Sequence, residues 1–111
     1  MRKRNQEVGH RHFLRLPVLV SVKGRAAQFG ETELQGVVRN VGGGGLMAEF
    51  PVQIVPGSVV DLTLQTRQGP VPVTGEVAWT GTPGPQVAHG IALREPRGEE
   101  FVRELVQHEQ G

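Results

Sequence analysis

Apolar and polar residues alternate in short runs along most of the chain, which is the pattern of strands that bury one face. The clearest case is 60–65, where Val60, Leu62 and Leu64 alternate with polar side chains. Turn signals such as Pro56-Gly57 separate this run from its neighbours. Six strands are predicted in this way, over residues 17–23, 34–41, 46–50, 60–65, 71–79 and 87–93.

The run over 71–79 also carries predictions about single residues. Strict alternation assigns Trp79 to the same face as Val73 and Val77. Gly75 lies on the same strand and marks a bulge or a close approach of another backbone. Residues 24–30, which begin and end with glycine, are predicted to form a loop.

The hydrophobic period changes near the C-terminus. Apolar residues recur at helical spacing over 101–106, and Pro96 with the acidic residues after it suits the start of a helix. The chain is therefore predicted to be one all-β domain over 17–111, in which six antiparallel strands close into a β-barrel and a C-terminal α-helix packs against it. Residues 1–16 have no clear period and are assigned to an arm.

The composition agrees with a small domain that contains many turns. The chain has 111 residues, including 16 glycines and 8 prolines, more than the usual background of about 7% and about 5%. It has no cysteine, which excludes a disulfide framework and thiolate metal ligands. No apolar run approaches the length of a signal-peptide core or a membrane span, so a cytoplasmic protein without a membrane span is expected.

The formal net charge is only +1, which argues against a general nucleic-acid coat protein. The charges are unevenly placed, because the first fifteen residues contain Arg2, Lys3, Arg4, Arg11 and Arg15. Such an arm either binds a small anionic ligand or serves as a solvated tail. With one tryptophan and no tyrosine, the chain offers few platforms for base stacking, so RNA or DNA binding is disfavoured.

Patterns typical of catalysis or metal binding are missing from the sequence. None of the four histidines has the HExxH spacing, and His10 and His12 lie in a basic arm that would repel a cation. The two serines, Ser21 and Ser58, stand outside any nucleophile-elbow context. We therefore expect neither an enzyme nor a protein with a metal or an organic cofactor.

Four consecutive glycines, Gly42 to Gly45, follow the predicted strand over 34–41. They do not form a phosphate-binding P-loop, because Gly-Lys-Ser/Thr does not follow them. They do not match the dinucleotide fingerprint either, because a strand follows where a helix is required. Taken alone, the glycines indicate either a mobile turn or a place where another group approaches the backbone.

The order of several short motifs is more informative than any one of them. In chain order they are Arg11-x-x-x-Arg15, Asn40-x-Gly42-x-x-Gly45, Gly75-Glu76-Val77-Ala78-Trp79 and Gly90-Ile91-Ala92-Leu93. Over roughly residues 9–108 this order resembles the PilZ domain family, whose pattern begins with RxxxR and (D/N)xSxxG. The resemblance implies a six-stranded antiparallel β-barrel with a C-terminal α-helix. It also implies a receptor for cyclic di-GMP, a bacterial second messenger.

The resemblance also implies roles for five residues. Arg11 and Arg15 would contact the guanines and phosphates of the ligand, and Asn40 would reach a guanine edge. Gly45 would keep the turn at the strand end open. Gly42 stands where the family has serine, so a hydroxyl that could bond the ligand is missing. On this basis, replacing Gly42 by serine is predicted to tighten binding.

Two functions are compatible with the resemblance. The first is a single-domain cyclic di-GMP receptor or adaptor, in which the ligand draws Arg11 and Arg15 toward Asn40 and orders the arm. The ordered arm would then change the binding of an unidentified protein partner. The second is a PilZ-like protein-interaction module that does not bind cyclic di-GMP, or binds it only weakly. Gly42 favours the second function, and the intact arginine pair favours the first.

Overall fold

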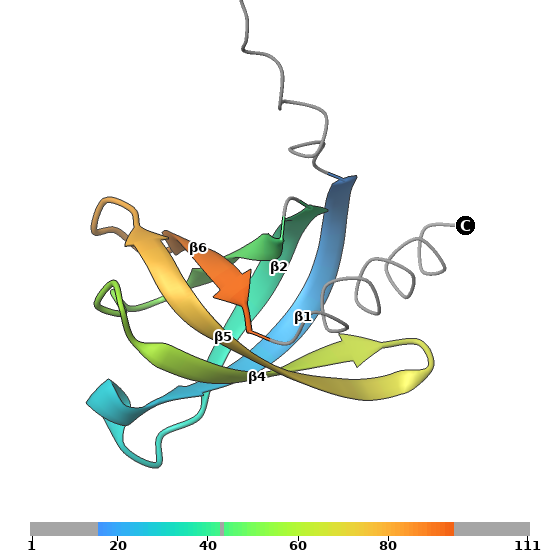
Figure 1. Ribbon diagram of the computed structural model, residues 1–111, viewed down its shortest axis with the longest axis horizontal. Coiled ribbons are helices and arrows are strands. Elements are labelled where there is room, and N and C mark those ends of the chain that lie inside the picture. Colours follow the sequence, from blue (N-terminus) through green and yellow to red (C-terminus); the bar gives the residue numbers. More distant parts are fainter. Residues whose placement is uncertain (1–15, 43, 95–111) are drawn as a thin grey trace, which may run out of the picture.

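Six antiparallel strands close into a barrel in the computed structural model, which describes residues 16–42 and 44–94 (Figure 1). The strands are β1 (Leu16–Ala26), β2 (Leu34–Gly42), β3 (Gly45–Phe50), β4 (Val59–Thr66), β5 (Gly69–Thr80) and β6 (Val87–Leu93). Their order around the barrel is β1-β2-β3-β6-β5-β4, and β4 pairs with β1 to close it. All six predicted strands are confirmed, with their ends moved by a few residues.

Alternate positions of the strands fill the interior of the barrel. On β1, Val20 and Val22 are buried, whereas Leu19 points outward and is 72% exposed. On β4, the predicted alternation is confirmed, since Leu62 and Leu64 are buried and the residues between them are not. Burying a side chain of this size is worth about 1.5–3 kcal/mol relative to exposure. The inward positions therefore account for the stability of the barrel and leave the outward ones available for other roles.

Two predictions about the fold need correction. Residues 24–26 continue β1 instead of starting a loop, because Gly24 pairs with Leu62 and Ala26 with Val60 of β4. A short 3-10 helix, η2 (Ala27–Phe29), follows. The predicted C-terminal α-helix lies outside the described residues, which contain no α-helix, so the supported fold is the six-stranded barrel alone.

No helix among residues 16–42 and 44–94 has the length and apolar character needed to cross a membrane.

Strands approach one another closely at Gly75, as the sequence indicates. A β-carbon at this position would overlap the side chain of Ile91 on β6. Gly75 is buried and pairs with Val60 on one side and Leu93 on the other. The missing side chain therefore makes room for a core residue of the neighbouring strand.

The segment between β3 and β4 folds back onto the barrel and is held there by the buried residue Ile54. The Ile54 N–H donates a hydrogen bond to Nε2 of His89 at 3.0 Å, and the Thr80 hydroxyl donates to the Ile54 carbonyl. Burial lowers the pKa of His89 below its ordinary value of 6.5. The backbone carbonyls of Val87 and Ala48 raise the pKa of His89, but by less than burial lowers it. Neither carbonyl is close enough to form a hydrogen bond with Nδ1. His89 is therefore a neutral core residue that holds this segment.

Candidate functional site

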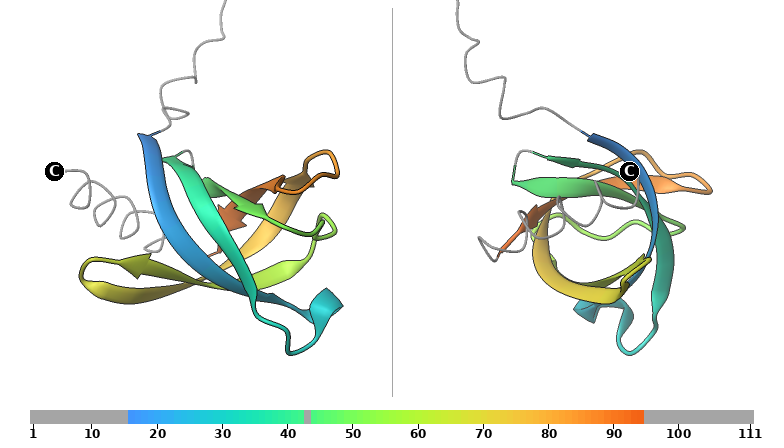
Figure 2. Two further views of the ribbon diagram at one scale, coloured as in Figure 1. Left: turned by 180° about the vertical axis from the view of Figure 1, so that it is seen from behind. Right: turned by 90° about the vertical axis from the view of Figure 1, so that its right-hand side faces the viewer.

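The start of β1 lies directly beside the end of β2. Pro17 pairs with Asn40 and Leu16 with Val41, and Figure 2 shows the two strand ends side by side. Residues 1–15, which include both predicted arginines, lie outside the described residues. Leu16, which the sequence assigned to the arm, is the first residue of β1. Residues 1–15, called the arm from here on, are therefore attached next to Asn40.

Asn40 belongs to a row of positions on the outer face of the barrel. On β3 its partner is Met47, which in turn pairs with Gly90 on β6. Gly90 pairs with Trp79 on β5, and Pro17 extends the row to β1. We call Pro17, Asn40, Met47, Gly90 and Trp79 the outer row. Asn40 and Trp79 are three strand spacings apart, roughly 14 Å at about 4.8 Å per spacing.

Irregularities in strand pairing are concentrated along the outer row. The register shifts between Pro17 and Val20 in β1–β2, between Val38 and Asn40 in β2–β3, and between Val77 and Trp79 in β5–β6. A bulge of this kind adds one residue to a strand, redirects the side chains beside it, and is over-represented next to functional sites.

On β2, the bulge places two consecutive side chains on the outer side. Val38 and Val41 are both buried, and between them Arg39 is exposed and Asn40 is half-buried. Strict alternation would turn one of the two intervening side chains inward. The extra residue therefore allows Asn40 to join the outer row while Val41 remains in the core.

Trp79 lies on the outer face, so its predicted assignment to the face of Val77 was wrong. Val77 is buried, but the register shifts at Ala78, and Trp79 is 44% exposed. Its indole ring lies over Gly90, where a β-carbon would overlap Nε1, Cε2 and Cδ1 of the ring. Sequence reasoning therefore missed Trp79 as a surface residue. The glycine on the partner strand was the signal that could have found it.

A hollow of about 140 Å³ opens on the outer face beside Trp79. It lies between the glycine turn and the indole, and Ala78 and Ala92 contribute methyl groups to its lining. Gly42 and Gly45, both predicted site residues, also line it. Among the residues that the structure describes, every lining residue is apolar or glycine, so the polar atoms that they contribute are those of the backbone and the indole nitrogen.

The described glycines of the turn differ in what they contribute. Gly42 has a φ of 153° and Gly44 a φ of 90°, values that favour glycine over other residues. The carbonyl of Gly44 accepts a hydrogen bond from the Leu93 N–H at 3.1 Å. A β-carbon at Gly45 would overlap the carbonyl oxygen of Ile91. Gly45 therefore allows β3 and β6 to approach, a role that the motif alone did not indicate.

Two ion pairs flank the outer row. Nε of Arg39 lies 3.1 Å from Oε1 of Glu49, and Nη2 of Arg94 lies 3.5 Å from Oε1 of Glu76. All four side chains are partly exposed, so each pair contributes at most about 1 kcal/mol to stability. The five residues of the outer row carry no formal charge. The outer row itself therefore offers a dianionic ligand no cation, and the two arginines beside it are each paired with a carboxylate.

Solved structures with the same fold contain PilZ domains. The chain is similar to the PilZ domain with c-di-GMP of YcgR from Escherichia coli, with a TM-score of 0.71 and 8% identity over 87% of this chain and 88% of that one. It is also similar to the PilZ domain of CeSA from a cellulose-synthesizing bacterium, with a TM-score of 0.63 and 16% identity over 88% and 99%. At these identities the likeness shows the fold alone.

A search of the curated proteins found no match. The family model of the PilZ domain matches residues 9–108, which span the arginine motif, the glycine turn and the whole barrel. The chain therefore belongs to the PilZ domain family.

Proposed function

We propose that this protein is a receptor for cyclic di-GMP, which it holds between the arm and the outer row. The observation that carries the proposal is the pairing of Pro17 with Asn40. Because of this pairing, the arm that contains Arg11 and Arg15 is attached beside Asn40, which the family pattern assigns to a guanine edge. Membership of the family supports this choice of ligand, as does the presence of c-di-GMP in the YcgR structure.

The charges of the barrel support a direct role for the arm. Cyclic di-GMP carries two phosphodiester charges, whereas the outer row is uncharged and Arg39 is paired with Glu49. An arginine guanidinium can bond phosphate oxygens through two parallel N–H groups, and it can bond O6 and N7 of guanine in the same way. Arg11 and Arg15 are therefore the proposed source of the unpaired positive charge that the outer row lacks.

Asn40 is proposed to contact a guanine edge, because its amide carries both an acceptor oxygen and a donor nitrogen. It is half-buried on β2, which restricts the orientations its side chain can take. Gly42 supplies no side chain, so the hydrogen bond from the family's serine is lost. That bond is worth about 0.5–1.5 kcal/mol, or roughly twofold to tenfold in affinity. Binding would therefore be weaker than with serine at this position.

Ligand binding is proposed to signal by ordering the arm. A ligand that contacts Arg11, Arg15 and Asn40 together would fix the arm against the end of β2. A partner protein that contacts the ordered arm would then bind the liganded form more tightly, and the ligand would shift the equilibrium by that difference in affinity.

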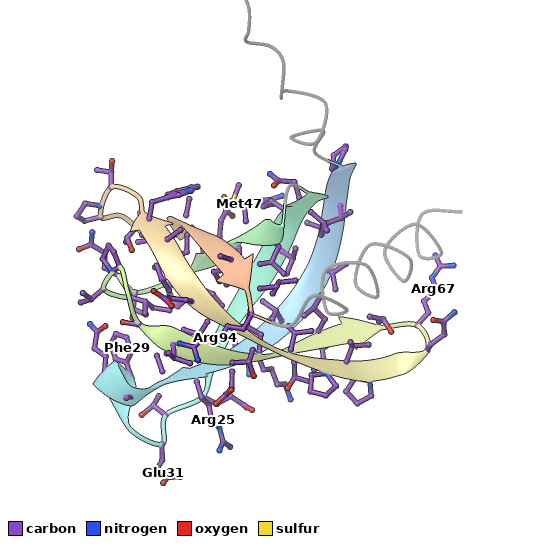
Figure 3. The ribbon with its side chains drawn as sticks, in the orientation of Figure 1. Arg25, Phe29, Glu31, Met47, Arg67 and Arg94 are labelled. Atoms are coloured by element: carbon purple, nitrogen blue, oxygen red, sulfur yellow. The ribbon has the colours of Figure 1, made fainter. Side chains whose placement is uncertain are left out.

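Titration calorimetry with cyclic di-GMP tests this function. We expect saturable binding to the full chain and loss of most of the affinity in Arg11→Ala, Arg15→Ala and Asn40→Ala. Arg25→Ala is the control, because Arg25 lies near the far end of β1 and, in Figure 3, on the opposite side of the barrel from Met47. It removes one positive charge and should leave binding nearly unchanged.

Two results would contradict the proposal. No heat at high micromolar ligand would favour the alternative function, a PilZ-like protein-interaction module, which the glycine at position 42 also supports. Binding that is unchanged in both arginine variants would mean that the ligand does not use the arm.

A further inference from the structure

We propose that Arg39 is a further cation for the bound cyclic dinucleotide, and that it exchanges its ion pair with Glu49 for a contact with a ligand phosphate. The pair restrains Arg39 before the ligand binds, so Glu49 lowers the affinity of the receptor. This inference rests on the proposed function and adds a barrel residue to the two arginines of the arm. Neither Arg39 nor Glu49 belongs to the motifs that select the other site residues.

Arg39 lies at the edge of the proposed binding face. The bulge in β2 places Arg39 and Asn40 on the outer side together, and consecutive α-carbons are about 3.8 Å apart. Glu49 lies on β3, two residues from Met47 of the outer row, and the buried Ala48 separates them. The ion pair of Arg39 with Glu49 therefore lies beside the Asn40 end of the outer row, where the arm is attached.

The ion pair uses only a small part of the guanidinium. Nε of Arg39 donates a single hydrogen bond of 3.1 Å to Oε1 of Glu49. Arginine presents its N–H groups in a planar fork, and its strongest pairs with carboxylates use two of them side by side. Within residues 16–42 and 44–94, neither Nη group of Arg39 has a partner. The pair therefore leaves most of the donors of Arg39 without an acceptor in the described part of the chain.

The existing pair is weak enough for a ligand to replace it. The side chains of Arg39 and Glu49 are 48% and 25% exposed, and such a pair is worth at most about fivefold in an equilibrium constant. A hydrogen bond to a charged group is worth about 12-fold to 150-fold. A phosphate can accept two parallel N–H groups from one guanidinium, and a ligand that covers the contact reduces its screening by salt. The exchange therefore favours the liganded form.

Arg39 is the partner that moves. Its side chain is more exposed than that of Glu49, and exposed side chains change rotamer within picoseconds to nanoseconds. Its backbone is fixed in β2 next to Asn40, so the exchange needs a new rotamer and no movement of the barrel. The carboxylate of Glu49 stays on β3, where it also repels the two phosphodiester charges. Glu49 therefore opposes binding both by holding Arg39 and by its own charge.

A double-mutant cycle tests the exchange. Titration calorimetry with cyclic di-GMP is performed on the full chain, on Arg39→Ala, on Glu49→Gln and on the variant with both changes. Arg39→Ala should weaken binding at least about twofold, and Glu49→Gln should tighten it by about twofold to fivefold. Arg39→Ala should cost more in the Glu49→Gln background, about 12-fold to 150-fold, because no ion pair has to be broken there.

Two charges at the far end of the barrel provide matched controls. Arg25 lies near the end of β1, and Figure 3 shows it on the opposite side of the barrel from Met47. Glu33 immediately precedes Leu34, which pairs with Gly24 beside Arg25. Arg25→Ala and Glu33→Gln make the same changes of charge as the two test variants. Each should leave the affinity nearly unchanged, and circular dichroism establishes that every variant is folded.

Nitrogen-15 NMR of the arginine side chains gives a readout that a merely structural role would not move. The Nε–H group of Arg39 donates to a carboxylate oxygen of Glu49 before the ligand binds. Its resonance should shift when the wild type is saturated with cyclic di-GMP, because the acceptor changes to a phosphate oxygen. The Nε–H resonance of Arg25 should stay in place.

The outcomes separate this inference from the proposed function. If the wild type binds cyclic di-GMP and folded Arg39→Ala binds it equally well, the exchange is overturned and the receptor function stands. The same conclusion follows if Glu49→Gln leaves the affinity unchanged, if it tightens binding by one factor with and without Arg39, or if the Arg39 resonance does not shift. No binding by the wild type would contradict the receptor function, and the exchange would fall with it. If a variant does not fold, the wild-type resonance decides.

Discussion

Trp79 covers Gly90 so closely that position 90 has no room for a β-carbon under the indole ring. The consecutive strands β5 and β6 are therefore fitted to each other on the outside of the barrel, where most residues tolerate substitution. The contact has consequences for stability and for the proposed binding face, and both can be measured.

Gly90→Ala should displace the indole from β6. We expect a loss of about 1–3 kcal/mol in the free energy of unfolding, the usual cost of inserting a methyl group where no space exists. The emission of Trp79 should also shift to the red as the ring enters solvent. Denaturant unfolding and fluorescence measure the two effects.

Gly84→Ala provides the control for Gly90→Ala. A β-carbon at Gly84 would meet nothing within 4 Å, so its stability should be unchanged or slightly higher. Equal stability of the Gly90 and Gly84 variants would contradict the close contact.

Gly42→Ser should tighten the binding of cyclic di-GMP but lower the stability of the barrel. The backbone of Gly42 has a φ of 153°, and holding a residue with a side chain in such a region costs about 1–3 kcal/mol. This cost is present with and without ligand, so it lowers the melting temperature and not the affinity. The added hydroxyl contributes about 0.5–1.5 kcal/mol to binding, or roughly twofold to tenfold in affinity. Unchanged affinity would mean that the hydroxyl makes no contact with the ligand, and unchanged stability would show that the turn adapts without strain.

The stability of the barrel should fall when the pH drops below 6.5. Burial lowers the pKa of His89 in the folded state, so between that lowered value and 6.5 the unfolded chain binds the proton and the folded chain does not. The contribution of His89 is therefore complete above pH 6.5 and is lost as the pH falls toward the folded pKa. Protonation of Nε2 would also turn the acceptor of the Ile54 N–H into a donor, so this hydrogen bond would be lost.

His89→Gln isolates this effect, because glutamine can still accept from Ile54 but does not titrate. Free energies of unfolding are measured for both proteins on either side of pH 6.5. As the pH falls below 6.5, the wild type should lose more unfolding free energy than His89→Gln does. A constant difference would mean that His89 takes no part in the acid response.

The in–out assignment of the strands predicts opposite results for two leucines. Leu62→Ala removes a buried side chain and should cost about 2–5 kcal/mol of unfolding free energy. Leu19→Ala changes a side chain that is 72% exposed, and we expect a change within about 0.5 kcal/mol. Chemical denaturation compares the two. Similar losses at both positions would contradict the assignment of Leu19 to the outer face.

The six strands could be predicted because alternation is a local property of the chain. Val20 and Leu64 were assigned correctly to the core, since their neighbours in sequence identify the inward face. The continuation of β1 past Gly24 was missed because glycine is usually taken as a strand breaker. In the barrel, Gly24 pairs with Leu62, and a β-carbon there would be pressed against the side chains of Leu62 and Phe50. The reason for glycine at this position therefore lies in side chains of other strands, which the local sequence does not reveal.

The candidate site was only partly accessible to sequence reasoning. Asn40 was selected through the family motif, and it lies beside the start of β1; its contact with a ligand stays a prediction. Trp79 was missed because its face depends on a bulge against β6, which no window of consecutive residues reveals. The hollow was also missed, since glycines and alanines from β3, β5 and β6 must come together to form it.

The bulges and the alternation of the strands have a consequence for how this barrel can vary. Asn40, Met47 and Trp79 share their strands with core residues but point to the opposite side. Mutations at these outward positions can therefore change the proposed binding face while the interior packing is kept. Gly90 is the exception, because a substitution there disturbs the fold and the proposed binding face together. A lineage of such barrels could drift from receptor to protein adaptor through surface changes alone, and an intact fold would be no guide to whether the ligand is still bound.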